Sequence, residues 1–339
     1  MRTHVLATVS LLLGAAAAPA LAQSYHVTHT YTLGGDGGWD YLALDTAGHR
    51  LFIARQDRVM VVNPETGALL GEIPGLNRAH GVAFDYATGH GFATSGADST
   101  VTMFDLKTLA VLGRTVAAID DDGVLFDPAT GHVFTMNGDA GSATAIDGAT
   151  GQRLGSVDLG GKPEFGVSAG DGMLYVNLED KSEVVEVDAR AMRVTRHWSI
   201  RPCEGPSGLA VDREHHLLFS GCRSGVMGVS DARAGRLITT VPIGRGVDAC
   251  RFDAARRLAF ASNGDGTITV IREDSPTAFS VAANVSTKAG ARTMELDEAT
   301  GRLYTVTADF GPAPAPTPER PRPRPPVLPG TFALLVLEP

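Results

Sequence analysis

The sequence is poor in cysteine and in basic side chains, and beyond its N-terminus it contains no long hydrophobic run. Three cysteines among 339 residues exclude a disulfide-rich scaffold and a four-cysteine zinc site. Twenty-nine Lys and Arg residues against 38 Asp and Glu give a formal net charge of −9, which argues against nucleic acid and anionic membrane surfaces as partners. The motifs of covalent haem attachment, phosphate-binding loops and zinc proteases are also missing. What remains is an acidic globular chain whose function must be sought in how its residues are arranged.

The first 22 residues differ in composition from the rest of the chain. Arg2 gives a positive start, residues 5–18 are apolar, and residues 20–22 form an A-x-A cleavage signal before Gln23. This pattern is typical of a secretory signal peptide, and its apolar stretch is short for a membrane span. We therefore expect cleavage after Ala22, a mature chain of residues 23–339 without a membrane span, and a periplasmic or secreted location.

A single unit repeats seven times along the chain. Each unit has a short apolar run that ends in Asp, a turn, an apolar run with an aromatic residue, a small polar residue and another apolar run. The first run ends at intervals of 40 to 44 residues, at Asp45, Asp85, Asp127, Ala169, Asp212, Asp253 and Asp297. The aromatic residue follows six or seven positions later, at Phe52, Phe92, Phe134, Tyr175, Phe219, Phe260 and Tyr304. With turn residues between the runs and no helical periodicity, each unit predicts four short strands.

Four strands at this period are typical of a β-propeller blade, which buries its apolar faces by stacking against its neighbours. The seven units predict an all-β, seven-bladed propeller of four-stranded blades, formed as one domain by residues 23–339. The last unit has only three strands of its own, near residues 293–296, 303–307 and 332–337. We expect residues 24–33 to supply its fourth strand and so to close the ring.

Residues 310–330 interrupt the last unit and contain nine of the chain's 19 prolines. Proline lacks the backbone N–H that a strand or helix needs, so this segment predicts an insertion loop of polyproline character between the second and third strands of blade seven. Such loops open on the same face as the loops that lead into the blades. The segment is therefore either a flexible excursion or a flap near the channel mouth, and it also offers a segment to a protein partner.

Three of the units carry a resemblance to a known family. They read "GVAFDYATGHGFATS", "GVLFDPATGHVFTMN" and "GLAVDREHHLLFSGC". They are similar to the Gly-Val/Leu-Ala-Val-Asp-Pro-x-Thr-Gly-x-Leu-Tyr-Val-x-Asn theme of the YncE-like, YVTN-repeat family of seven-bladed propellers. The resemblance covers essentially residues 24–339 apart from the proline-rich insert. It implies the propeller architecture and an exported binding or scaffold protein, and it implies no particular activity.

One position per unit lies five residues before the end of the first run, at the start of the innermost strand. Because the repeat places this position once in every blade, its side chains are expected to surround one mouth of the central channel. The seven residues, here called the mouth ring, are Asp40, His80, Asp122, Glu164, Ser207, Asp248 and Arg292. Four carboxylates in a narrow ring repel one another, so they need a cation, an arginine, a raised pKa or ample water.

Three interpretations of the mouth ring are open. In the first, the ring is a hydrated channel mouth in which Arg292 pairs with a carboxylate on either side, Asp40 and Asp248. In the second, the ring binds a divalent cation, and oxygen-rich ligands with one imidazole suit Ca²⁺, Mn²⁺ or Zn²⁺. The ligands would then be Asp40, His80, Asp122, Glu164 and Asp248. In the third, the mouth binds an organic cation or another polar small molecule.

The three cysteines divide into a pair and a single residue. Cys203 lies in the loop that leads into blade five, and Cys222 follows the second strand of that blade, so both lie on the same face. In an exported chain this predicts a Cys203–Cys222 disulfide beside Ser207 of the mouth ring. Cys250 lies inside an apolar strand and is expected to be buried and free.

These observations predict an exported, monomeric binding protein whose ligand, a small molecule or a divalent metal ion, occupies the acidic mouth. One alternative is a metal-dependent lactone hydrolase of gluconolactonase type, in which the ion polarises a carbonyl and Glu164 or Asp122 activates water. That family's own motifs are not found in this chain. The other alternative is a protein-interaction scaffold that uses the rim or the proline-rich loop. No residue is assigned a catalytic role.

Overall fold

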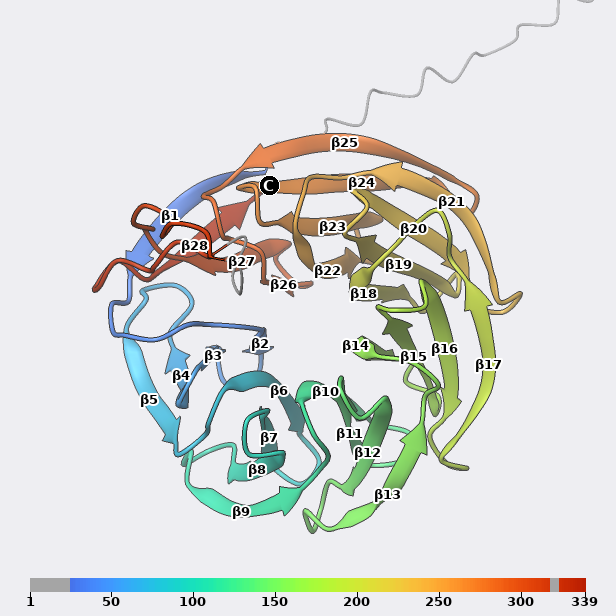
Figure 1. Cartoon of the computed structure of the whole chain (residues 1–339), viewed down its shortest axis with the longest axis horizontal. Coiled ribbons are helices and arrows are strands. Elements are labelled where there is room, and N and C mark those ends of the chain that lie inside the picture. Colours follow the sequence, from blue (N-terminus) through green and yellow to red (C-terminus); the bar gives the residue numbers. More distant parts are fainter. Residues whose placement is uncertain (1–24, 318–322) are drawn as a thin grey trace, which may run out of the picture.

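The computed structural model describes residues 25–317 and 323–339, and in these residues the chain forms seven four-stranded antiparallel sheets and no helix. The sheets are arranged as blades around a common axis (Figure 1). The prediction of an all-β, seven-bladed propeller is therefore confirmed. The described part of the chain has no helix with the length and apolar character needed to cross a membrane.

Each blade has the same order of strands from the axis outward. The innermost strands are β2 (Leu42–Asp45), β6 (Ala79–Asp85), β10 (Asp121–Asp127), β14 (Pro163–Ser168), β18 (Pro206–Asp212), β22 (Val247–Asp253) and β26 (Met294–Asp297). The second strands are β3 (Arg50–Arg55), β7 (His90–Ser95), β11 (His132–Asn137), β15 (Met173–Leu178), β19 (Leu217–Cys222), β23 (Leu258–Asn263) and β27 (Arg302–Thr307). The third strands are β4 (Arg58–Val62), β8 (Thr100–Asp105), β12 (Ser142–Asp147), β16 (Glu183–Asp188), β20 (Val226–Asp231), β24 (Thr267–Ser275) and β28 (Ala333–Glu338). The outermost strands are β5 (Leu69–Pro74), β9 (Val111–Val116), β13 (Arg153–Asp158), β17 (Arg193–Ser199), β21 (Arg236–Pro242), β25 (Ala278–Ser286) and β1 (His26–Thr32).

The apolar core lies between adjacent blades. The second strands are almost continuously buried, because a neighbouring blade covers each of their faces, whereas the outermost strands show an alternating, half-exposed pattern. One core cluster joins Phe134 of blade three to Val176 and Val185 of blade four, and another joins Phe52 of blade one to Phe104 of blade two. The repeated aromatic residue is thus the main filling of each blade-to-blade contact.

The Asp that ends the innermost strand in six of the seven blades has a structural role. In Asp85, Asp127 and Asp253 the carboxylate accepts hydrogen bonds from backbone N–H groups two or three residues later, as in the 3.0 Å bond from Ala87 N to Asp85. Together with backbone bonds such as that from Gly89 N to Asp85 O at 3.0 Å, this geometry closes the turn to the second strand. The Asp that recurs along the sequence therefore marks a turn rather than a functional site.

The ring closes through its N-terminal strand. Strand β1 pairs antiparallel with β28, so blade seven consists of β26, β27 and β28 from the C-terminal region and β1 from the N-terminal region. The predicted closing strand is confirmed over His26–Thr32. The predicted signal peptide of residues 1–22 and its cleavage position lie outside the described residues.

The proline-rich insertion folds back across the mouth face between β27 and β28. Its two described arms pair through a bridge of Phe310 with Val327, with hydrogen bonds from Gly311 N to Pro326 O at 2.9 Å and from Leu328 N to Asp309 O at 2.8 Å. The ring of Phe310 lies 6.1 Å from that of Trp39, in the loop before β2. We call residues 309–317 and 323–330 the strap.

Candidate functional site: an acidic ring at the channel mouth

The mouth ring occupies equivalent places in all seven blades. Five of its members are the second residues of β6, β10, β14, β18 and β22, and the other two lie two residues before β2 and β26. In each of those five strands the pairing with the second strand shifts in register at or just after this position. Such bulges re-aim side chains and are common at the rims of closed sheets. The bulge is thus the local device that turns this residue toward the axis.

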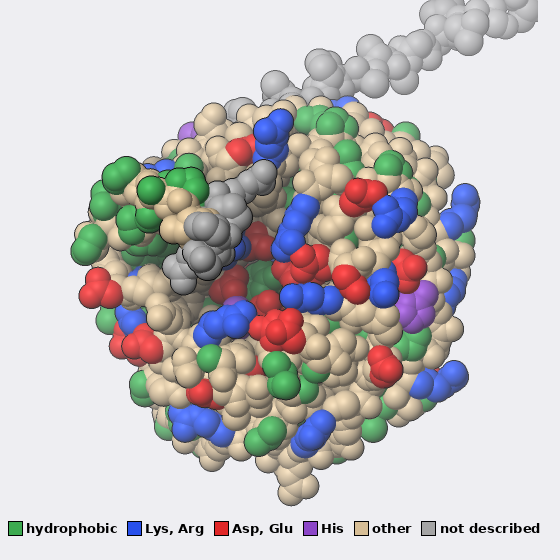
Figure 2. All heavy atoms as spheres, viewed as in Figure 1, with side chains coloured by type: hydrophobic (Ala, Val, Ile, Leu, Met, Phe, Trp, Pro, Cys, Tyr) green, Lys and Arg blue, Asp and Glu red, His purple; other side chains and the backbone are tan. Residues whose placement is uncertain are grey.

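The side chains surround a cavity of about 560 Å³ at the mouth of the channel. Six of the seven ring residues line it, and Ser207 lies against two of these six. Figure 2 shows acidic side chains inside this central hollow and basic side chains around its edge. The register of the repeat therefore brings together residues that are about 40 positions apart in the sequence.

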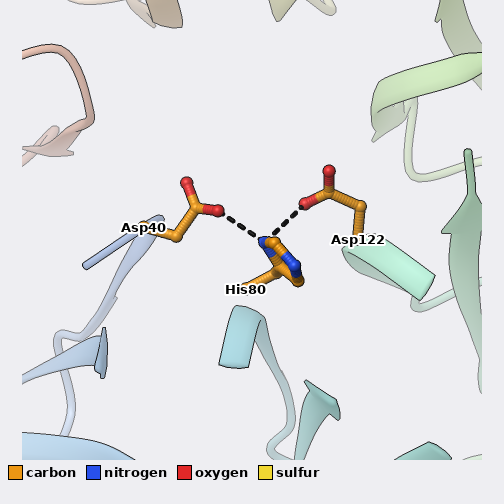
Figure 3. A group of neighbouring side chains, drawn as sticks. All are labelled: Asp40, His80 and Asp122. Atoms are coloured by element: carbon orange, nitrogen blue, oxygen red, sulfur yellow. Dashed lines mark hydrogen bonds and ion pairs between the residues drawn. The ribbon is translucent and has the colours of Figure 1, made fainter. Parts of the chain in front are cut away.

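His80 lies between two carboxylates (Figure 3). Its Nδ1 donates to Asp40 Oδ2 at 2.5 Å and lies 3.2 Å from Asp122 Oδ1. The ring is only 7% exposed and packs against Gly96, where a Cβ would come within 2.9 Å of the imidazole. A glycine at that position is therefore required by the close approach of the imidazole to the backbone.

The other half of the ring is linked by hydrogen bonds and one arginine. Ser207 Oγ lies 3.3 Å from Glu164 Oε1 and 3.0 Å from Asp248 Oδ1. Arg292 Nη1 lies 2.9 Å from Asp248 Oδ2, and its Nη2 lies 4.0 Å from Asp40 Oδ1. Among the described residues, no hydrogen bond or ion pair joins Asp122 to Glu164. The contacts thus run around the ring with a single gap, between blades three and four.

Burial and mutual repulsion disturb the protonation of these groups. Burial raises the pKa of Asp122 to about 7, against the attraction of His80 and with the help of Asp40. Burial and the charge of Asp122 raise the pKa of Glu164 to about 8. Burial also raises the pKa of Asp248, although Arg292 opposes the shift. For His80, burial lowers the pKa, but the neighbouring Asp40 and Asp122 outweigh it and the pKa rises. Each change reduces the negative charge that the cavity must hold.

Two aromatic side chains, here called the floor, lie where the cavity meets a second hollow of the channel. Tyr41 contacts Phe165 edge-on at 5.0 Å and lines both this cavity and a second one of about 300 Å³ deeper in the channel. Burial and the surrounding carboxylates hold the pKa of Tyr41 well above its usual range, so the phenol stays protonated. These residues follow Asp40 and Glu164 directly in sequence. The position after each ring residue is Tyr or Phe in two blades and Gly, Ala or Thr in the other five. The two large aromatic residues at this position are the sequence signal from which the floor could have been predicted.

A basic rim surrounds the acidic ring. Arg78 pairs with Asp120 at 2.8 Å, and Arg223 pairs with Glu179. Arg324 of the strap also lines the cavity, and no ion pair to a described carboxylate is formed by it. The proline-rich loop therefore brings a cationic side chain to the mouth, on the same face as the loops that lead into the blades.

A second group of metal-ligand type, on the turn that follows β18, is electrically balanced. His215 Nδ1 lies 2.6 Å from Asp212 Oδ2 and 3.4 Å from Glu273 Oε1, and all three are close enough to ligate one ion. Arg257 also lies 2.7 Å from Glu273 Oε1. Two carboxylates here face one arginine and one imidazole, so the charges of the group balance as an ion-pair network.

The stretch Gly166–Gly170 has the letters of a serine-hydrolase nucleophile elbow, Gly-x-Ser-x-Gly. In the structure it ends strand β14 and enters a turn, and no helix follows. Ser168 Oγ donates to Asp127 Oδ1 at 2.6 Å and accepts from Gly170 N. Ser168 is therefore a buried structural hydroxyl rather than an activated nucleophile.

The predicted Cys203–Cys222 disulfide is confirmed, with a Cα–Cα distance of 5.5 Å. It ties the loop before β18, and so the approach to Ser207, to the end of β19. Such a bond is typical of an oxidising compartment. Cys250 is fully buried and free, as expected.

Comparison with known proteins adds no relative to this picture. No protein-family model matches the chain, and no curated protein matches it. The architecture of a seven-bladed propeller therefore stands on the structure itself, and functional inference rests on the chemistry of the mouth.

Proposed function

We propose that this protein is an exported binding protein that holds a divalent metal ion at the mouth of its channel. The observation that carries the proposal is the convergence of Asp40, His80 and Asp122, whose ligand atoms all lie within 4.8 Å of one another. A metal ion would replace the proton that His80 Nδ1 places between the two carboxylates. The disulfide and the composition of residues 1–22 support export to the periplasm, and the repeat motifs support kinship with YncE-like propellers.

The charge of the ring supports a divalent ion. With all carboxylates ionised, Asp40, Asp122, Glu164 and Asp248 carry four negative charges and Arg292 carries one positive charge, whereas a His80 that binds a metal ion is neutral. The balance is −3, and one divalent cation reduces it to −1. The balanced Asp212 group has no such excess. Glu164 and Asp248 are thus assigned to charge balance around the three ligands.

The mixture of donors favours certain metals. Two carboxylates and one imidazole suit Mn²⁺ or Zn²⁺, whereas Ca²⁺ prefers an all-oxygen set of six to eight ligands. Within the three cations expected from the sequence, Mn²⁺ and Zn²⁺ are therefore preferred. The remaining coordination positions face the cavity and are open to water or to a ligand.

The test is titration of the chelator-treated protein with Mn²⁺ and Zn²⁺ by calorimetry, together with thermal unfolding. We expect one site at the mouth, whose affinity falls by at least about tenfold in Asp122→Asn, since a carboxylate ligand is lost. His215→Gln is the matched control and should bind at the mouth like the parent protein. The metal proposal fails if metal-free and metal-loaded protein unfold at the same temperature, or if Asp122→Asn binds as tightly as the parent.

A metal-dependent hydrolase is the second candidate. The observation that favours it is Glu164, a carboxyl group of raised pKa on the strand next to that of Asp122, at the edge of the open cavity. Such a group can act as a general base toward water once a metal ion polarises a carbonyl. A panel of lactones assayed with added Ca²⁺, Mn²⁺ or Zn²⁺ tests this, and lack of hydrolysis across the panel removes the candidate.

A further inference from the structure

A second hollow joins the acidic cavity from the side. Its volume is about 710 Å³, and it shares with the acidic cavity Gly38, Trp39, Arg223, Asp248, Arg292 and Arg324. The two hollows therefore form one continuous space with two chemically different parts. We call the second part the side pocket.

One wall of the side pocket is apolar and comes from the strap. Phe310 and Val327 are 37% and 36% exposed, and both line this space. Trp39 completes the wall, held by contacts of its ring with Phe332 at 5.2 Å and with Phe310 at 6.1 Å. Large apolar side chains that remain exposed around a hollow are typical of a ligand pocket.

Another part of the lining is made of backbone. Gly246, Gly264 and Gly290 line it, and their backbones are linked by hydrogen bonds from Gly264 N to Gly246 O and from Gly290 N to Gly264 O, each 2.9 Å long. The three glycines belong to three loops of the mouth face and leave part of the lining without side chains. Gly290 packs against the ring of Phe310, since a Cβ there would come within 2.8 Å of that ring. The apolar part and the glycine part of the lining therefore meet, and an aryl group can contact both.

The charges at the junction of the two hollows select an anion. Arg292 is paired with Asp248 at 2.9 Å, and Arg223 is paired with Glu179. Arg324 lines both hollows and pairs with no carboxylate in the part of the chain that the structure describes. Its guanidinium is therefore available to a carboxylate, which it can bind with two parallel hydrogen bonds.

We propose that the side pocket binds a small aryl carboxylate, with its apolar body against Trp39 and Phe310 and its carboxylate at Arg324. The inference rests on the proposed function in one respect, because a metal ion at the mouth ring would add attraction for the carboxylate. An organic cation is the competing ligand, and the arginines at the junction disfavour it.

The experiment uses 3-phenylpropanoate as the probe and 3-phenylpropylamine as its cationic counterpart with the same body. The chain has two tryptophans, so Trp198→Phe leaves Trp39 as the only source of tryptophan fluorescence. In this variant we expect a saturable change in Trp39 emission with the acid. The amine should bind at least about tenfold more weakly, the factor typical of one charge-assisted contact.

Steric and charge variants locate the bound acid. Gly38 lines both hollows, and a Cβ added there meets no atom within 4 Å, so Gly38→Leu should fill the pocket and abolish the signal. Gly113, in the outermost strand β9, has equally open surroundings, and Gly113→Leu is the matched control that should bind normally. Arg324→Gln should weaken binding about tenfold.

Repeating the titration with Mn²⁺ and with chelator separates the two proposals. We expect Mn²⁺ to tighten binding of the acid by about tenfold, since it adds one more charge-assisted contact. If Mn²⁺ binds but the acid gives no saturable signal, the inference about the side pocket fails alone. If the acid binds in a Gly38-dependent way but no metal binds, the metal proposal fails and the side pocket stands. Tighter binding of the amine, or binding unaffected by Gly38→Leu, overturns the inference.

Discussion

Replacing Glu164 by Gln should stabilise the metal-free protein above neutral pH. In the native ring this side chain faces the charges of Asp122, Glu179 and Asp248, with Arg223 as the opposing cation. Its pKa in the folded protein is about 8, against 4.5 for an ordinary glutamate. The folded chain thus holds the proton more tightly than the unfolded chain. Between these two values the folded state loses stability as the pH rises, and below 4.5 neither state is affected.

The size of the effect follows from the distance between the two pKa values. Each pH unit corresponds to about 1.36 kcal/mol, so a native pKa of about 8 implies a cost of up to about 3 kcal/mol at pH 7. Water in the open cavity and the sharing of protons with Asp122 reduce this cost, and we expect about 1–3 kcal/mol. Gln carries no charge at any pH, and its Oε1 can still accept from Ser207. The substitution should therefore remove the cost without opening a hole.

The assay is thermal and urea-induced unfolding of the parent and Glu164→Gln at pH 5 and pH 8, with chelator present. We expect a difference of about 0.7 kcal/mol or less at pH 5, half a unit above the ordinary pKa of 4.5, and a midpoint several degrees higher for the variant at pH 8. Saturating Mn²⁺ should remove the difference, since the metal ion supplies the charge balance in the parent protein. If the variant is no more stable than the parent at pH 8, the reasoning about repulsion in the ring is wrong.

Two further predictions concern the supports of the site. Replacing Cys203 and Cys222 by Ala should lower the free energy of unfolding by about 3 kcal/mol, because the disulfide closes a loop with a sequence separation of 19; unchanged urea unfolding would contradict this. Arg55 is fully buried, donates from Nη2 to the carbonyl of Asp36 at 2.8 Å, and lies 3.6 Å above the ring of Phe332. Arg55→Met should therefore lower the free energy of unfolding by about 1–3 kcal/mol. It should also weaken metal binding, because Arg55 anchors the loop that carries Asp40. Loss of stability with unchanged metal affinity would show that the loop is held by other contacts.

The fold was predictable because the propeller is a repeat whose strands obey local rules. An apolar run and an aromatic residue six or seven positions after it recur in every blade, and an Asp that closes a turn recurs in six of the seven, each with one physical purpose. The repeat register then placed the mouth ring without any knowledge of side-chain contacts. Because the blades are related by rotation about one axis, residues at the same position of the repeat lie close together around that axis. Asp40, His80 and Asp122 could therefore be grouped although they are about 40 positions apart in the sequence.

Features that break the repeat were not predictable in the same way. Arg55 contacts the loop before β2, and Arg324 lies in the strap. These segments differ from the equivalent loops of the other blades, so the repeat does not predict which residues the two arginines contact. The group of Asp212, His215 and Glu273 joins blades five and six through a turn, and from the sequence the histidine is simply a turn residue. Its contact with Glu273 depends on the length of β24, which has nine residues where the third strands of most other blades have six.

The distribution of contacts in the ring indicates where the unbalanced charge lies. Ser207 and Arg292 each serve two neighbours, so the carboxylate of Asp248 is satisfied from both sides. On the opposite side, His80 serves both Asp40 and Asp122, Arg292 reaches Asp40 only at 4.0 Å, and the contacts end at the gap before Glu164. The excess negative charge therefore lies over blades one to four rather than evenly around the axis. A cation in this mouth would be held off-centre, beside His80, which leaves the side toward Arg292 and the strap open for a second ligand.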